Sequence, residues 1–146
     1  MMKSKKIQAK AEIKDFGIQK VITFWVDPNL SKEMVILLLL LRERLVNSLD
    51  LIFDNFSIYL KQNNNENKSV CNLFNNNKKI FKGAISINSL EFAISYLLKY
   101  YRDEMAEVEH IDLDFDYEKN TIVTLIIKTN LFKDISSDEM NKLLGL

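Results

Sequence analysis

A row of acidic residues with a histidine at its head is the part of this sequence best suited to chemistry. Polar and apolar residues alternate along this stretch, and the side chains of a β-strand point alternately to its two faces. The pattern therefore predicts acids on one face and apolar residues on the other, with His110, Asp112, Asp114 and Asp116 on the first and Ile111, Leu113 and Phe115 on the second. Alternate residues of a strand lie about 6.5 to 7 Å apart, so neighbouring carboxylates repel each other only moderately in water.

Such a row has three interpretations: a site for Mg²⁺ or Ca²⁺, a plain solvated sheet face, or a docking surface for a basic partner. Both cations take oxygen ligands, but the sequence lacks the glycine and the twelve-residue loop of a calcium hand. It also lacks a second acidic cluster that would complete a two-metal nuclease site. We expect no metal and no cofactor, which leaves solvation and docking open.

His110 is the only histidine, and it is the one side chain that titrates near neutral pH. Asp112 shares its strand face and could orient the ring, whereas Glu109 points the other way. No motif places a serine or cysteine nucleophile near the ring, and a histidine at the start of a strand can simply bond a backbone group. We therefore expect no catalytic residue. A hydrolase or metal-dependent enzyme that uses His110, Asp112 and Asp114 is the enzymatic alternative.

The single cysteine, Cys71, excludes an internal disulfide framework and a cysteine-based zinc site. It has no basic neighbour and no helix start beside it, so we expect a buried, unreactive thiol. Three glycines and one proline also leave little material for a glycine-rich phosphate loop.

Charge is unevenly distributed along the chain, although 20 basic and 20 acidic residues give a net charge of zero. Between Asp103 and Glu118 there is no lysine or arginine, and this stretch adds Glu107 and Glu109 to the acidic row. Lysines are concentrated in residues 3–20 and 61–82. Segregated charge steers a charged partner, so the acidic stretch predicts a basic protein partner. The neutral total argues against direct binding of nucleic acid, which needs many basic side chains.

Aromatic residues form a second candidate binding surface on a predicted helix. Phe92, Tyr96 and Tyr100 recur every four residues beside the predicted core stripe of that helix, which consists of Leu90, Ile94, Leu97 and Tyr101. Interfaces favour tyrosine and phenylalanine because these side chains bury area with little loss of rotamer freedom. The alternative is that the sheet covers this face of the helix.

Hydrophobic periodicity predicts a single α+β domain spanning residues 1–146, with a mostly antiparallel sheet, two main helices and a short C-terminal helix. Alternation and turn signals predict strands at Ile7 to Phe16, Ile18 to Val26, Asp50 to Lys61, Ser69 to Phe74, Lys79 to Ile87, His110 to Tyr117 and Thr121 to Thr129. Helices are predicted from Leu30 to Ser48 after Asp27-Pro28, from an Asn88 cap to Ala106, and after a Ser136 cap near the C-terminus. We find no internal repeat, and we expect the asparagine-rich turns to connect a meander.

Two features bear on location. The lysine-rich N-terminus is not followed by the apolar segment of a signal peptide. The apolar run from Met34 to Leu41 is far shorter than the roughly 20 residues needed to cross a bilayer. We expect a cytoplasmic protein without a membrane segment, in which this run is a buried helix.

From Asn88 to Phe115 the sequence resembles small bacterial immunity proteins of contact-dependent and other polymorphic toxin systems, in having a capped helix that leads into an acid-bearing strand. The resemblance covers about a fifth of the chain. It implies a cytoplasmic α+β domain that binds one cognate toxin domain, often a nuclease, through acidic residues. The alternative function is a homo-oligomeric structural or regulatory subunit of phage or mobile-element origin, suggested by the run from Met34 to Leu41, and this alternative includes a homodimer.

Overall fold

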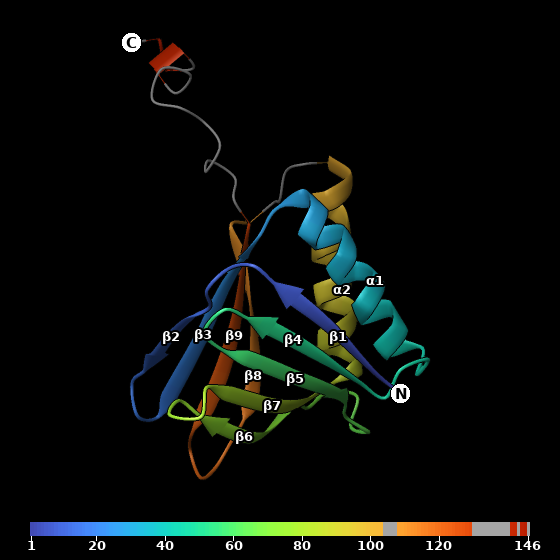
Figure 1. Ribbon diagram of the computed structural model, residues 1–146, viewed down its shortest axis with the longest axis vertical. Coiled ribbons are helices and arrows are strands. Elements are labelled where there is room, and N and C mark those ends of the chain that lie inside the picture. The colour runs from blue at the N-terminus through green and yellow to red at the C-terminus, as the bar shows by residue number, and fades with distance from the viewer. Residues whose placement is uncertain (104–107, 130–140, 143, 146) are drawn as a thin grey trace.

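A mixed β-sheet and a pair of helices form the molecule in the computed structural model, which describes residues 1–103, 108–129, 141–142 and 144–145 (Figure 1). The described strands are β1 (Met2–Ile7), β2 (Glu12–Asp15), β3 (Gln19–Val26), β4 (Ser48–Phe53), β5 (Ser57–Gln62), β6 (Val70–Asn75), β7 (Ile80–Ile85), β8 (His110–Asp116) and β9 (Ile122–Thr129). The helices are α1 (Pro28–Arg42) and α2 (Ile87–Asp103). An α+β fold is confirmed.

The sheet is mixed, so the prediction of a mostly antiparallel sheet was wrong. Among the described strands the order is β1-β4-β5-β7-β6-β8-β9-β3-β2. Each of the four hairpins is antiparallel, but β1 with β4, β5 with β7, β6 with β8 and β3 with β9 pair in parallel. The predicted meander was also wrong, because β7 lies between β5 and β6. The asparagine-rich segment after β5 is therefore a crossover, whereas the one after β6 is a hairpin turn.

The topology repeats itself, although the sequence shows no repeat. A hairpin, a helix and a second hairpin follow each other twice, first as β2-β3-α1-β4-β5 and then as β6-β7-α2-β8-β9. Each half has a matching hydrogen bond between the end of its third strand and the segment before its first strand: Asp54 N donates to Ala9 O and Asp116 N donates to Ser69 O, each at 3.0 Å. The parallel pairs β5 with β7 and β3 with β9 join the two halves into one sheet.

Both helices pack against each other on one side of the sheet (Figure 1). Asp27 caps α1 as predicted, because its carboxylate accepts a 2.7 Å hydrogen bond from Leu30 N while Pro28 occupies the first turn. The predicted extension of this helix to Ser48 was wrong, since the chain leaves it after Arg42 and enters β4.

The second helix begins two residues earlier than the sequence predicted. Its cap is Ser86, whose hydroxyl accepts a hydrogen bond from Ser89 N at 3.1 Å, rather than Asn88. Asn88 instead donates its backbone N–H to Glu66 O in the crossover. The local capping pattern was outweighed by this contact with a distant segment.

The predicted first strand is two strands, because residues 8–11 form a link between β1 and β2. β1 pairs with β4 and only β2 forms the predicted hairpin with β3. The predicted C-terminal cap, Ser136, and most of the helix after it lie outside the described residues. No helix in the described ranges has the length and apolar character needed to cross a membrane.

Aromatic rings connect strands that are not neighbours in the sheet. The rings of Phe24 on β3 and Phe53 on β4 lie 5.0 Å apart, although these strands belong to distant positions in the strand order. The sheet is therefore curled around its core. This curvature leaves the outer side of β8, β9, β3 and β2 facing away from the helices.

Candidate protein-binding face

The acidic row is exposed on β8, as the alternation predicted. Asp112, Asp114 and Asp116 are exposed, whereas the intervening Ile111, Leu113 and Phe115 are at most 4% exposed. Burial of the apolar residues fixes the register of the strand, because a shift by one residue would put the acids into the core. Burial of the intervening apolar residues therefore keeps all three carboxylates on the outer side of the sheet.

Each carboxylate has one polar neighbour at the surface. Asp112 lies 3.5 Å from His110 Nε2, Asp114 accepts a 2.6 Å hydrogen bond from the Thr124 hydroxyl, and Asp116 lies 3.6 Å from Lys68 Nζ. An ionised carboxylate has about four acceptor sites on its two oxygens. Each acid therefore retains acceptors for a partner, and ion pairs this exposed are worth only about 0 to 1 kcal/mol.

Apolar side chains extend this surface across the neighbouring strands. Residues directly opposite each other in a sheet project from the same face. Asp112 is opposite Ile126, Asp116 is opposite Ile122, and the next strand contributes Val21 and Trp25. We call the outer side of these strands the open face, and its members are Asp112, Asp114, Asp116, Ile122, Ile126, Val21 and Trp25.

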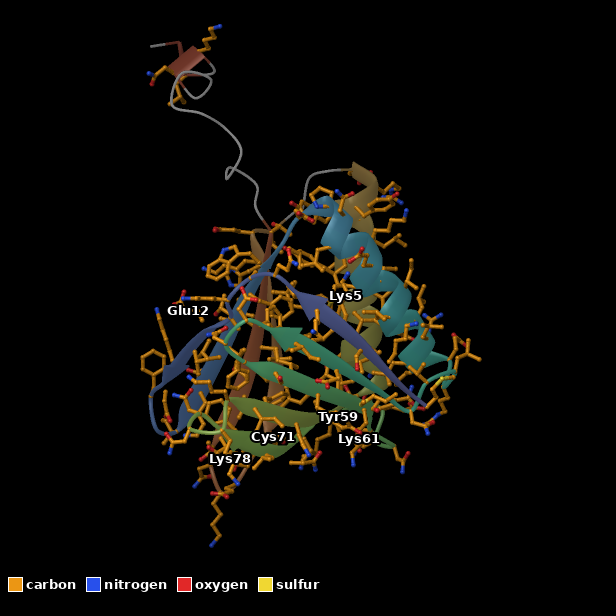
Figure 2. All side chains as sticks on the ribbon, in the orientation of Figure 1. Lys5, Glu12, Tyr59, Lys61, Cys71 and Lys78 are labelled. Atoms are coloured by element: carbon orange, nitrogen blue, oxygen red, sulfur yellow. The ribbon has the colours of Figure 1, made fainter. Side chains whose placement is uncertain are left out.

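The apolar side chains of the open face are partly accessible to solvent. Ile122 is 38% exposed, and Val21, Trp25 and Ile126 are half-buried. Lys128 lies over the Trp25 ring with its Nζ 5.8 Å from the ring centroid. On β2, at the far side of this face, Glu12 projects from the sheet (Figure 2). Lys14 Nζ lies 3.0 Å from a carboxylate oxygen of this Glu12, so the apolar stripe lies between the acidic row and an ion pair.

The sequence analysis missed the apolar part of this face. Val21 and Trp25 lie on β3, and Ile122 and Ile126 lie on β9. Both strands are apolar on both of their faces, which is the sequence signal that could have identified them. In a sheet that helices cover on one side only, such strands indicate an apolar outer surface.

The predicted aromatic stripe divides among three environments. Phe92 is 54% exposed, Tyr96 is half-buried, and Tyr100 is only 2% exposed. Each four-residue step turns about 40° further around a helix, so Tyr100 has rotated about 80° from Phe92 into the core. Tyr100 is therefore not on a binding surface, and Tyr101, which the periodicity had placed in the core stripe, is 38% exposed.

Tyr96 instead attaches α2 to the sheet. Its hydroxyl donates to Val108 O at 3.0 Å and lies 3.4 Å from the Thr129 hydroxyl. Burial is the main factor that raises the pKa of this phenol. Glu109 is exposed next to this junction, while Glu107 lies outside the described residues.

Catalytic and metal chemistry finds little support at this face. His110 is exposed, and within the described part of the chain its side chain forms a contact with the Asp112 carboxylate at 3.5 Å. Within the described residues no three acidic, histidine or cysteine side chains are arranged to hold a metal ion. Cys71 is buried as predicted, and this burial raises the pKa of its thiol to about 12.

Comparison of the chain with protein-family models, with curated proteins and with solved structures gives no match in any of the three. The interpretation of the open face therefore depends on its own chemistry.

Proposed function

We propose that the protein is an immunity-type binding protein, which neutralises a toxin domain by docking a basic surface of that domain on the open face. The observation that carries the proposal is the exposed row of Asp112, Asp114 and Asp116 beside a partly exposed apolar stripe. A nuclease is the partner class that best suits an acidic inhibitor, because its substrate-binding surface is basic.

The two parts of the face have different tasks in this proposal. The acidic row attracts a basic partner over distance and raises the association rate. The apolar stripe supplies area that leaves water on binding, at about 25 cal/mol per Å². Aromatic residues such as Trp25 commonly dominate interface energy, so we expect this side chain to be a main contact.

The homo-oligomeric alternative loses the feature that suggested it. Within the run from Met34 to Leu41, the residues Met34, Val35, Leu37, Leu38 and Leu41 are buried inside the chain itself. Ile36 is half exposed, but a single exposed apolar residue needs no second subunit.

A comparative capture experiment tests the proposal. The bait is the tagged wild-type chain, and its counterpart carries Asp112→Asn, Asp114→Asn and Asp116→Asn. A matched control removes three exposed acids from other surfaces, through Asp54→Asn, Glu66→Gln and Glu91→Gln. We expect a basic protein to be captured from the source cell by the wild type and the control, and to be lost with the first variant.

The neutralisation step has its own test. The captured protein is expressed in a host cell, where a toxin would stop growth. We expect co-expression of the wild type or the control to restore growth, and the acidic-row variant to fail. If the partner is harmless alone, or if both variants protect equally, the immunity proposal is wrong.

A further inference from the structure

A second charged surface lies along the first strand, and it is basic whereas the row on β8 is acidic. β1 is an edge strand, which pairs with β4 on one side and with no other described strand. Along β1 and the link after it lie Lys3, Lys5, Lys6 and Lys10. Figure 2 shows Lys5 where β1 runs beside α1.

Two hollows form a groove between this edge and the side of α1. The larger, of about 680 Å³, is lined by residues 5–10, by Trp25 and the capping residue Asp27, and by the first turns of α1, including Leu30 and Glu33. The smaller, of about 210 Å³, is lined by residues 3–5 with Glu33, Ile36 and Leu37. Leu30, Glu33 and Leu37 recur at helical spacing, so one side of α1 forms the wall along the whole groove.

One ion pair divides the groove. Lys5 Nζ lies 2.7 Å from a carboxylate oxygen of Glu33, which joins β1 to α1 between the two hollows. The two side chains are 34% and 50% exposed, and pairs in this environment contribute only about 0 to 1 kcal/mol. Another carboxylate could therefore replace Glu33 as the partner of Lys5 at little cost.

We propose that this groove binds an extended acidic segment of a partner protein, which adds to the sheet as a further strand beside β1. An edge strand offers unpaired backbone groups to an added strand, and this mode of recognition combines backbone hydrogen bonds with side-chain specificity. The apolar wall from Leu30, Ile36 and Leu37 receives apolar side chains, and the lysines select acidic ones. A second copy of β1 is disfavoured, since its own lysines would face these lysines. This inference does not require the function proposed for the open face, although Trp25 borders both surfaces.

A titration followed by NMR tests the inference on the intact chain. The probe is a seven-residue peptide of alternating glutamate and valine, added to ¹⁵N-labelled protein. We expect shifts at the amides of β1 and at the indole N–H of Trp25, which is the only tryptophan. A peptide with lysine in place of glutamate should cause no such shifts.

Backbone methylation separates strand addition from simple charge attraction. Two further peptides carry N-methyl groups on alternate residues. One is methylated at the odd-numbered residues and the other at the even-numbered residues, and we call these two patterns the two phases. Only one edge of an added strand faces β1, so one phase should abolish binding and the other should preserve it. Equal binding of both methylated peptides, absence of shifts at millimolar peptide, or shifts confined to other strands would overturn the inference. A short oligophosphate that matches the peptide in affinity would also overturn it.

Two protein variants sharpen the result. Glu33→Gln removes the internal competitor of Lys5, so we expect it to tighten binding of the acidic peptide. Lys6→Glu with Lys10→Glu should weaken binding by roughly tenfold or more, because like charges repel the peptide. The matched control, Lys78→Glu with Lys119→Glu, makes the same charge change at exposed positions elsewhere and should bind as the wild type does. The proposal would be contradicted if Glu33→Gln did not bind the acidic peptide more tightly and the variant with Lys6→Glu and Lys10→Glu did not bind it more weakly.

Discussion

At the scale of single residues, a glycine lies against a pair of packed aromatic rings in the core. The rings of Phe81 and Phe115 meet edge to face with centroids 5.1 Å apart, and both are fully buried. A Cβ on Gly83 would lie 2.7 Å from Phe81 Cζ and 3.0 Å from Phe115 Cε2. Gly83 is therefore the residue that makes room for this aromatic pair.

We predict that Gly83→Ala destabilises the protein by about 1 to 3 kcal/mol, since an added methyl group forces the buried rings to move. Urea unfolding gives the free energy of unfolding directly. A double variant with Phe81→Leu serves as the control, because the smaller side chain gives the methyl group space. Its loss should be smaller than the sum of the two single losses, and additive losses would show that the two positions do not clash.

Residue types alone predicted some positions well and others poorly. The alternation on β8 placed all six residues from Ile111 to Asp116 on the correct faces, because one face is buried along its whole length. The spacing of Phe92, Tyr96 and Tyr100 did not separate surface from core, since a step of four residues drifts around the helix. The apolar half of the open face was missed because no face was assigned to the apolar residues of the strands that became β3 and β9.

At the scale of elements, α1 illustrates how burial rather than propensity determines the role of a helix. Its apolar run is enclosed by α2 and the sheet, with Leu38 only 2% exposed and Ile36 50% exposed. Ser31 is also buried, and its hydroxyl donates to Leu97 O on α2 at 2.6 Å. The two helices are therefore joined by both apolar packing and one buried hydrogen bond.

We predict that Leu38→Ala lowers the free energy of unfolding by about 2 to 5 kcal/mol, through lost burial and the cavity that remains. The neighbouring Ile36→Ala removes a similar number of atoms from an exposed site and should cost less than about 1 kcal/mol. Chemical denaturation of both variants beside the wild type provides the comparison. Similar losses for the two would mean that the enclosed side of α1 is assigned wrongly.

Element boundaries depended on contacts that local sequence does not contain. The cap of α1 was predicted because Asp27-Pro28 is a strong local signal. The cap of α2 was misplaced to Asn88, whose backbone bonds to Glu66 in a segment more than twenty positions earlier. The end of α1 was misplaced because residues 43–48 contain no glycine or proline to stop a helix.

At the scale of the whole molecule, the parallel strand pairs were beyond the reach of the sequence. Hairpins join neighbours in sequence and have turn signals, so the pairs β2 with β3 and β8 with β9 were predicted. The parallel pairs join segments far apart in sequence, such as β3 and β9, and no local pattern specifies them. The repeated topology was hidden for the same reason, because it lies in pairing and not in residue types.

This arrangement gives the molecule two surfaces of different character. The open face carries the acidic row with an apolar stripe, and the edge of β1 carries the lysines. The acidic row and the lysines of β1 therefore lie on different elements of a chain whose net charge is zero. The central claim is that the open face binds a basic protein partner.

The affinity of the captured partner at two salt concentrations tests this claim most directly. Titration calorimetry would compare the wild type, the variant with asparagine at Asp112, Asp114 and Asp116, and the matched control at about 0.05 and about 0.5 M salt. We predict that the variant folds normally, binds at least about tenfold more weakly than the wild type and control at low salt, and loses less affinity as salt rises. Equal affinities and equal salt dependence for all three proteins would contradict the claim and exclude the acidic row from the interface.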